Sequence, residues 1–386
     1  GAEAKSLISD ASSSVAENVV RSPKAMLGKG NIYLSGREVE PASVVTDLMN
    51  FLKEDALNQD PDYGADFSHA VVSIPVSMNG RTRKELRDAL LRSGIHIVQF
   101  VHEPLAALYA YFKDQPNYEE TVSEYQGKLA LVFDWGGGTL DLTLCQVVEG
   151  SVTQIMNVGD NNVGGDYVDE AIRDYVIKKY REENVVEHPL DVNPGAKAKL
   201  LEACERAKIR LSERESDMIY ILDYFLTDEY DPDIHCMLTR DELDKVSEHF
   251  VARGLSTISK LLDKLNIDQR QISLCLATGG MINMPSIKQR LLQIFGIERL
   301  EVSHKGDRII SEGCAWIAHD EMRMTLAKPI EVLEARQSYL AAFKRGVKLP
   351  IEGDGLSESL GMYCVDPRDG KAKFQILRPQ HVNKTA

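Results

Sequence analysis

The sequence predicts an α/β protein, and two observations carry this prediction. Short apolar runs that suit buried strands alternate with longer segments in which apolar residues recur at the 3.6-residue period of a helix. Three of these runs are followed by glycine-rich turns, at residues 136–138, 164–165 and 279–280. Such turns are a common way to build a nucleotide cleft, because backbone amides from separate loops can converge on one polyphosphate.

The bulk composition fits an acidic globular protein of two or three domains. The chain has 386 residues and a formal net charge of −14, which disfavours nucleic acid or an anionic membrane as the main partner. Its six cysteines are scattered, and no apolar run approaches the roughly 20 residues that a membrane-spanning helix needs. The start of the chain has no signal-peptide pattern, so we predict a cytoplasmic protein.

The first elements are predicted from strand patterns and helix signals. Pro41 begins a helix whose apolar positions recur at the helical period. A strand covers Ala70 to Ile74, and the Asn79-Gly80 turn then leads into a helix that ends at Gly94. Residues 129–133 are almost wholly apolar, which predicts a buried strand.

The later elements continue this alternation. A strand around residues 151–158 precedes a helix with one apolar stripe, made of Val168, Ile172, Val176 and Tyr180. Thr239 and Glu242 form a capping box for a helix that we expect to end near Gly254. A further strand, at residues 272–277, leads into the third glycine turn.

The most informative stretch is residues 134–141, Asp-Trp-Gly-Gly-Gly-Thr-Leu-Asp. Its three glycines are Gly136, Gly137 and Gly138. They can adopt positive φ and have no Cβ, so their N–H groups can point at a phosphate. Asp134 and Asp141 lie where a hydrated Mg²⁺ or an attacking water would need anionic ligands, and Thr139 shares a strand face with Asp141. A plain hairpin turn is the alternative interpretation.

A polar stripe on a later helix is a second candidate surface. It consists of Glu205, Lys208, Ile209 and Ser212, at positions i, i+3, i+4 and i+7. These spacings place the four side chains on one face of the helix. Taken alone, such a stripe is most often a solvated surface, and it becomes a candidate for ligand contact only beside the glycine turns.

Together, these motifs resemble the ATPase domain of the 70-kDa heat-shock chaperones, within the actin and sugar-kinase superfamily. The resemblance is carried by residues 134–141 and 203–212 and by the glycine turns, in the family's order and spacing. Residues 101–107, Val-His-Glu-Pro-Leu-Ala-Ala, and residues 72–75, Val-Ser-Ile-Pro, also fit. The match covers roughly residues 15–320.

The resemblance implies an actin-like ATPase fold, with two lobes around a nucleotide cleft, followed by the start of a β-rich domain. The nucleotide-binding domain would cover residues 1–322, with its second lobe at about 128–322. Residues 323–386 would form a linker and the beginning of a β-rich, substrate-binding-like domain.

The resemblance also implies catalytic roles. Lys24 would orient the attacking water, and Thr139 would bind the γ-phosphate of ATP. Asp134 and Asp141 would order a hydrated Mg²⁺, which Glu103 would contact through water. Taken singly, each residue could instead have an ordinary structural role; Lys24, for example, could be a surface lysine.

Further roles concern the nucleotide and its signal. ADP or ATP would be contacted by Gly136, Gly137, Gly138, Gly165, Glu205, Lys208, Ile209, Ser212, Gly279, Gly280 and Asn283. Pro75, Arg83 and Glu103 match the trio that passes the nucleotide state to the substrate domain.

The function implied by this resemblance is an ATP-binding and ATP-hydrolysing chaperone whose nucleotide state gates a site for unfolded client polypeptides. A J-domain cochaperone and a nucleotide-exchange factor would be its partners. Two alternatives stay open: a nucleotide sensor or scaffold without turnover, and a small-molecule kinase of the superfamily. The helix at residues 203–208 resembles the chaperones rather than the sugar kinases.

The sequence departs from the family pattern in several places, one of which is residues 325–330, Thr-Leu-Ala-Lys-Pro-Ile, in place of the family's leucine-rich acidic linker. The Gly-x-Asp-x-Gly-Thr-Thr loop that opens the family's fold does not precede Lys24. Either that loop lies upstream of Gly1, which we expect, or the site is half-built. Trp135 replaces an aliphatic residue, and Ile209 and Asn283 replace two arginines that sandwich the adenine, which predicts weaker binding or a less strict choice of base.

Overall fold

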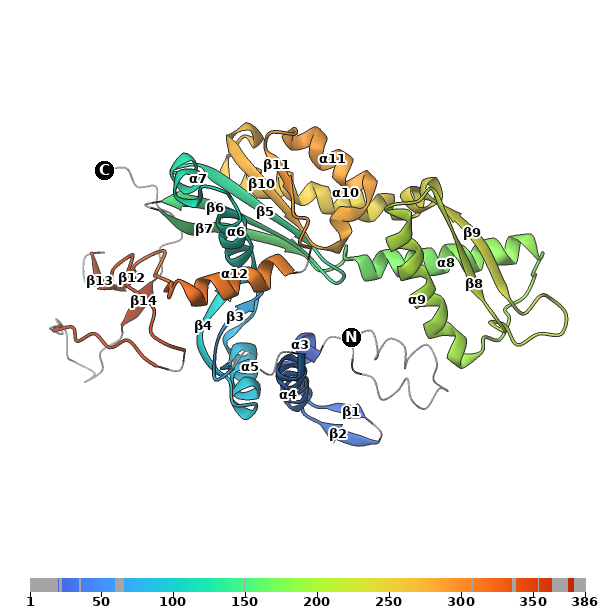
Figure 1. The fold of residues 1–386 in the computed structure, drawn as a ribbon, viewed down its shortest axis with the longest axis horizontal. Helices are drawn as coiled ribbons and strands as arrows, with labels where there is room; N and C mark the ends of the chain where they lie inside the picture. Colours follow the sequence, from blue (N-terminus) through green and yellow to red (C-terminus); the bar gives the residue numbers. More distant parts are fainter. Residues whose placement is uncertain are drawn as a thin grey trace.

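A computed structural model of the protein describes residue 20 and residues 23–34, 36–59, 66–148, 150–306, 308–334, 338–352, 354–362 and 374–377. The fold is α/β, as the sequence predicts, and its largest sheet has the strand order β11–β10–β5–β6–β7 (Figure 1). These strands are β11 (Leu300–Val302), β10 (Ile272–Thr278), β5 (Leu129–Trp135), β6 (Leu140–Val148) and β7 (Ser151–Asp160). The first three run parallel, and β6 and β7 pair antiparallel.

The large sheet is buried on both faces, which explains why β5 is almost wholly apolar. Leu131 and Phe133 pack on one face with α8, α10 and α11, whereas Ala130 and Val132 pack on the other with α6 (Glu103–Lys113) and α12 (Arg308–His319). The α6 and α12 helices cross closely, because a Cβ added at Gly313 would overlap the carbonyl group of Ala106.

The first part of the chain forms a smaller α/β unit. Its parallel strands are β3 (His69–Ile74) and β4 (His96–His102), and its helices are α3 (Pro23–Met26), α4 (Pro41–Gln59) and α5 (Gly80–Arg92). A hairpin joins β1 (Ile32–Leu34) and β2 (Arg37–Val39). Asn79 is part of the helix start rather than a separate turn, because its side chain accepts a hydrogen bond from the N–H of Thr82 at 3.0 Å. Gly94 has φ +75°, as expected for a helix end.

A second unit extends from one end of the molecule (Figure 1). It contains α8 (Gly165–Glu183), α9 (Pro194–Leu211) and the hairpin of β8 (Ser216–Ile221) and β9 (Ile234–Thr239). The predicted apolar stripe of α8 is buried, and the capping box of Thr239 and Glu242 begins α10 (Arg240–Leu265).

The predicted end of this helix at Gly254 is wrong. The α10 helix continues to Leu265, and Asn266, at φ +53°, caps it. Gly254 is buried in the helix interior, where a Cβ would overlap the ring of Trp135. The glycine therefore permits a close contact rather than stopping the helix.

The remaining elements complete the sheet surroundings and the end of the described chain. They are α7 (Tyr118–Glu124), the short helices η2 (Gln269–Gln271) and η3 (Gly280–Asn283), α11 (Pro285–Phe295), and a small sheet of β12 (Ile330–Leu333), β13 (Tyr339–Phe343) and β14 (Gln375–Leu377). In the ranges described above, no helix is both long and apolar enough to cross a membrane.

Candidate functional site

The centre of the site is a row of polar side chains at one edge of the large sheet. Thr278 pairs with Asp134 across β10 and β5, and Asp134 pairs with Asp141 across β5 and β6. Directly paired residues share a sheet face, so all three side chains point the same way. The Thr278 hydroxyl donates to Asp134 Oδ1 at 3.0 Å, and the Thr139 hydroxyl donates to Asp141 Oδ2 at 3.2 Å.

The two aspartates carry an unfavourable charge arrangement. Burial raises the pKa of Asp134 to about 6; the hydrogen bond from Thr278 opposes this change, and the charges of Glu103 and Asp141 add to it. Burial also raises the pKa of Asp141, against the hydrogen bond from Thr139. Paired carboxylates that resist ionisation fit a hydrated divalent cation, whose charge would relieve both the desolvation and the repulsion.

Lys24 and Glu103 meet although they lie far apart in the sequence. Lys24 Nζ lies 2.7 Å from Glu103 Oε1, and the Lys24 side chain is 44% exposed. Glu103 is the first residue of α6, where the helix dipole favours a carboxylate. Residues 22–24, Ser-Pro-Lys, resemble the family segment that holds the catalytic lysine, and Ser22 lies outside the described residues.

The predicted signalling trio is partly connected. The N–H of Met78 donates to the Pro75 carbonyl at 3.1 Å, and Arg83 Nε donates to the Met78 carbonyl at 3.1 Å. Arg83 Nη2 also lies 3.4 Å from His102 Nε2, and His102 directly precedes Glu103. The structure thus brings Pro75 and Arg83 to the start of α6.

The first glycine turn is a tight connection between β5 and β6. The N–H of Gly136 donates to the Thr139 carbonyl at 2.9 Å. Glycine can adopt positive φ, but none of the three glycines of this turn lies in the left-handed region. Gly137 and Gly138 are exposed, and a Cβ at Gly138 would meet no protein atom within 4 Å. The exposed edge of the turn therefore has room for a ligand.

The second glycine turn packs on the first. The N–H groups of Gly165 and Asp166 donate to the carbonyls of Gly136 and Gly137, at 3.1 and 2.8 Å. A Cβ at Gly164 would overlap the Gly137 carbonyl, so only glycine fits there. Because the Gly165 N–H already donates to the Gly136 carbonyl, it is not available to bind a phosphate in this conformation.

The third glycine turn lies against the strand end of β5. Gly279 has φ +90°, and a Cβ there would overlap the Trp135 carbonyl and lie 2.9 Å from Asp134 Oδ1. Gly280 then begins η3, which ends at the exposed Asn283. All three glycine turns therefore meet around the end of β5.

The polar stripe of α9 faces the start of α8. Lys208 is buried; its Nζ lies 2.8 Å from Asp169 Oδ1 and donates to the Gly165 carbonyl at 3.0 Å. Burial raises the pKa of Asp169 to about 6, although the Lys208 charge lowers it. Ile209 is 58% exposed, and Glu205 and Ser212 are half-buried. Lys208 thus joins α9 to α8 in this structure, and its contact with adenosine stays a prediction.

Sequence reasoning assigned no role to three residues that shape the site. Thr278 and Asp169 bind predicted site residues, and Gly159 pairs with Asp141 across β6 and β7. A Cβ at Gly159 would lie 3.0 Å from Asp141 Oδ1, so glycine leaves room for this carboxylate. Only for Thr278 was a sequence signal available, because it is a polar residue at the end of the strand that precedes the third glycine turn.

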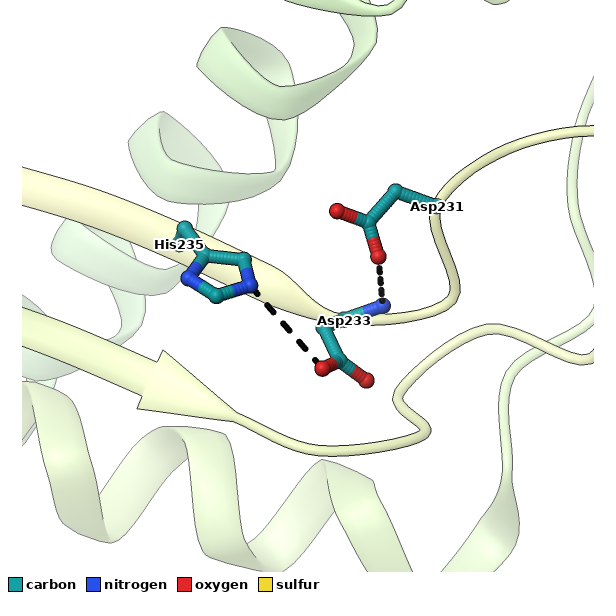
Figure 2. A group of neighbouring side chains, drawn as sticks. All are labelled: Asp231, Asp233 and His235. Carbon is teal, nitrogen blue, oxygen red and sulfur yellow. Dashed lines mark hydrogen bonds and ion pairs between the residues drawn. The ribbon is translucent and has the colours of Figure 1, made fainter.

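One group of three side chains, among the residues described, has ligand atoms within 4.8 Å of one another (Figure 2). It consists of Asp231, Asp233 and His235, on and before β9, outside the site. Hydrogen bonds within the hairpin already hold it: the N–H of Asp233 donates to Asp231 Oδ1 at 3.0 Å, and the Tyr220 hydroxyl donates to Asp233 Oδ2 at 3.1 Å. The predicted Mg²⁺ residues, Asp134, Asp141 and Glu103, do not form a group with ligand atoms this close together. The resemblance implies that Glu103 would contact the metal through water, which does not require such short distances.

Fold and site together define the class of this protein. Glycine turns that meet paired carboxylates at a sheet edge, with helices on both faces, are consistent with the actin-like ATPase fold. The model of the family described as Hsp70 protein matches residues 3–324. The chain belongs to the Hsp70 family, whose members generally bind ATP or ADP.

A curated relative supports this assignment. The chain is 28% identical over 281 residues to "Chaperone protein dnaK" of Phaeodactylum tricornutum (strain CCAP 1055/1). The aligned region covers 72% of this chain and 43% of that protein. The chain therefore spans less than half the length of this relative.

Replacing Asp134 with asparagine should stabilise the protein without ligand at neutral pH. The pKa of Asp134 is about 6 in the folded state and 3.8 for an aspartate in water, so the folded state holds the extra proton between these pH values. The free energy of unfolding therefore falls as pH rises through this window, and the penalty is complete above pH 6. Asp134→Asn removes it, for a gain on the order of 2 kcal/mol.

Urea denaturation with a chelator, at pH 7.5 and pH 4, checks this expectation. The gain should be present at pH 7.5 and nearly absent at pH 4. Asp47→Asn, at an exposed position of α4, is the matched control and should change stability at neither pH. Lower stability of Asp134→Asn at pH 7.5 would contradict the charge arrangement described here.

Proposed function

We propose that this chain is the nucleotide-binding part of an Hsp70-type chaperone that binds and hydrolyses ATP. The observation that carries the proposal is the register of β10, β5 and β6, which aligns Thr278, Asp134 and Asp141 beside three glycine turns. The family assignment and the similarity to a chaperone support the same function.

The proposed chemistry follows from where the side chains lie. Bound Mg²⁺ would supply positive charge beside the transferred phosphoryl group. Asp134 and Asp141 would hold the water shell of the metal, while Thr139 and the turn amides would hold the terminal phosphate. Lys24, whose side chain is partly exposed, would exchange its ion pair with Glu103 for contact with the γ-phosphate and the attacking water.

The wider role rests on the family rather than on the site. We propose that the nucleotide state gates the binding of unfolded polypeptides, with a J-domain cochaperone and a nucleotide-exchange factor as partners. We also propose a cytoplasmic location. The small sheet of β12, β13 and β14 follows the ATPase core and is a candidate start of the polypeptide-binding domain.

A second candidate is a nucleotide sensor that does not turn over. It is favoured by Ile209 and Asn283, both exposed, which stand where the family resemblance places two adenine-stacking arginines. A neutral aliphatic and an amide side chain lack the cation–π contact of arginine, so the base would be held less firmly.

Nucleotide binding is tested best at Gly138. A Cβ at this position meets no protein atom, so Gly138→Ala should leave the fold unchanged and obstruct only a ligand. We expect the affinity for Mg-ADP, measured by calorimetry, to fall on the order of tenfold or more. Gly80→Ala, at an equally open and exposed site on α5, is the control. Equal affinity of both variants for Mg-ADP would show that the phosphate does not bind at this turn.

Hydrolysis is tested with Lys24. Lys24→Ala should slow ATP turnover on the order of 10²-fold, because one preorganised charge is lost from the transition state. Lys29→Ala removes an exposed lysine of the same segment and should not change the rate. If the unsubstituted protein binds Mg-ATP without turnover above background, the sensor is the correct function.

The position of the base is tested by restoring the arginines. The double variant Ile209→Arg and Asn283→Arg should bind ATP roughly 5- to 50-fold more tightly, through cation–π contact on two faces. Both positions are exposed, so the longer side chains have room. Titration of ATP and GTP against both proteins measures the effect. Weaker or unaltered ATP binding would show that adenosine does not lie between α9 and η3.

A further inference from the structure

The indole ring of Trp135 lies beneath the site and not in it. Trp135 ends β5, directly before the first glycine turn, and it is fully buried. Successive strand residues point to opposite faces, so its ring lies on the face opposite the Asp134 carboxylate. Its Nε1 donates a hydrogen bond to the Val163 carbonyl at 2.8 Å, and its ring packs edge-on against Phe133.

This residue contacts all three glycine turns. It begins the first turn, its indole N–H holds Val163 beside the second, and its own carbonyl leaves no room for a Cβ at Gly279 in the third. Other contacts also tie the first two turns together, among them the hydrogen bonds from the N–H groups of Gly165 and Asp166 to the carbonyls of Gly136 and Gly137. Another is the packing of Gly164 on the Gly137 carbonyl, which the bond to Val163 holds in place.

The opposite side of the ring is fitted to α10. A Cβ at Gly254 would overlap the indole ring and lie 2.6 Å from its Cζ2 atom. Glycine is unfavourable in a helix interior, so its position at the middle of this 26-residue helix needs a reason. Room for the indole ring is that reason.

We propose that Trp135 is a positioning residue, whose indole group holds the three glycine turns in register and so sets the geometry of phosphate binding. An aliphatic side chain, which the family resemblance gives at this position, has no N–H for the Val163 carbonyl. This chain therefore positions its turns with a bond of its own. The inference rests on the proposed function for the identity of the ligand, and on the structure alone for the link between the turns.

The consequence of removing the indole N–H can be stated in advance. Trp135→Phe keeps an aromatic ring against Phe133 but leaves the buried Val163 carbonyl without its donor. The second turn should then open more often, and the phosphate site should be formed for less of the time. Affinity for Mg-ADP should fall roughly 3- to 10-fold.

The experiment uses the two tryptophans of the chain, Trp135 and Trp316. Trp316 is 37% exposed on α12 and has no part in the site, so Trp316→Phe serves as the control and should bind Mg-ADP as the unsubstituted protein does. In that variant Trp135 is the single indole, and its fluorescence should change when Mg-ADP is added. Trp135→Phe is then compared with it by calorimetry.

Amide hydrogen exchange gives a readout that needs no nucleotide. In Trp135→Phe, exchange in residues 161–166 should be faster, while exchange in the β8–β9 hairpin should not change. If Trp135→Phe folds poorly, Gly254→Ala replaces it, because the added methyl displaces the ring from the helix side. In a Trp135→Leu background, Gly254→Ala should have a smaller effect on the same measurements, since there is no indole ring to displace.

Two outcomes overturn the inference, and they differ from failure of the proposed function. Unchanged exchange in residues 161–166 of Trp135→Phe would show that the indole does not hold the second turn. Unchanged Mg-ADP affinity would show that this link does not set the phosphate site. If the unsubstituted protein does not bind Mg-ADP, the proposed function fails, and the exchange measurement still decides whether Trp135 positions the turns.

Discussion

The register of β5 against its two neighbours is the constraint on which the site depends. It places Asp134 beside Thr278 on one side and beside Asp141 on the other, and a shift of β5 by one residue would turn the Asp134 side chain to the opposite face. The apolar residues of β5 hold this register, because a slip would move Leu131 and Phe133 into the space that fits the smaller Ala130 and Val132 on the opposite face. The core thus determines the position of the charged groups.

The placement of Asp134 beside Asp141 lowers the stability of the protein without ligand, although it suits the binding of a cation. Two neighbouring ionised carboxylates at a buried sheet edge destabilise the folded state. Burial raises the pKa of Asp134 by more than the hydrogen bond from Thr278 lowers it. Such a cost is typical of sites that bind cations, where the ligand supplies the missing charge. Lys24 pairs with Glu103 nearby, and among the residues that the structure describes no lysine or arginine forms an ion pair with either aspartate.

The sequence could predict patterns but not contacts. The α8 stripe and the capping box of α10 follow from local periodicity and helix caps, and these predictions are confirmed. The role of glycine is different, because a glycine that ends a helix and one that admits a ring look alike. Gly254 was therefore misread, because it admits the ring of Trp135 and does not end the helix. Which partner needs the space is visible only in three dimensions.

The candidate site and the segment that follows α12 are joined through two shared elements. Glu103 begins α6, which crosses α12 at Gly313, and the chain leaves α12 for β12. That exit is held by Gln99 of β4, whose amide donates to the Met322 carbonyl at 2.6 Å and accepts from the Met324 N–H at 3.0 Å. Because β4 leads directly into Glu103, a displacement of this carboxylate by a ligand would act on the strand that also anchors the exit. The strand that ends beside Glu103 therefore also contacts the exit from α12, so the candidate site and the start of the following segment depend on the position of one element.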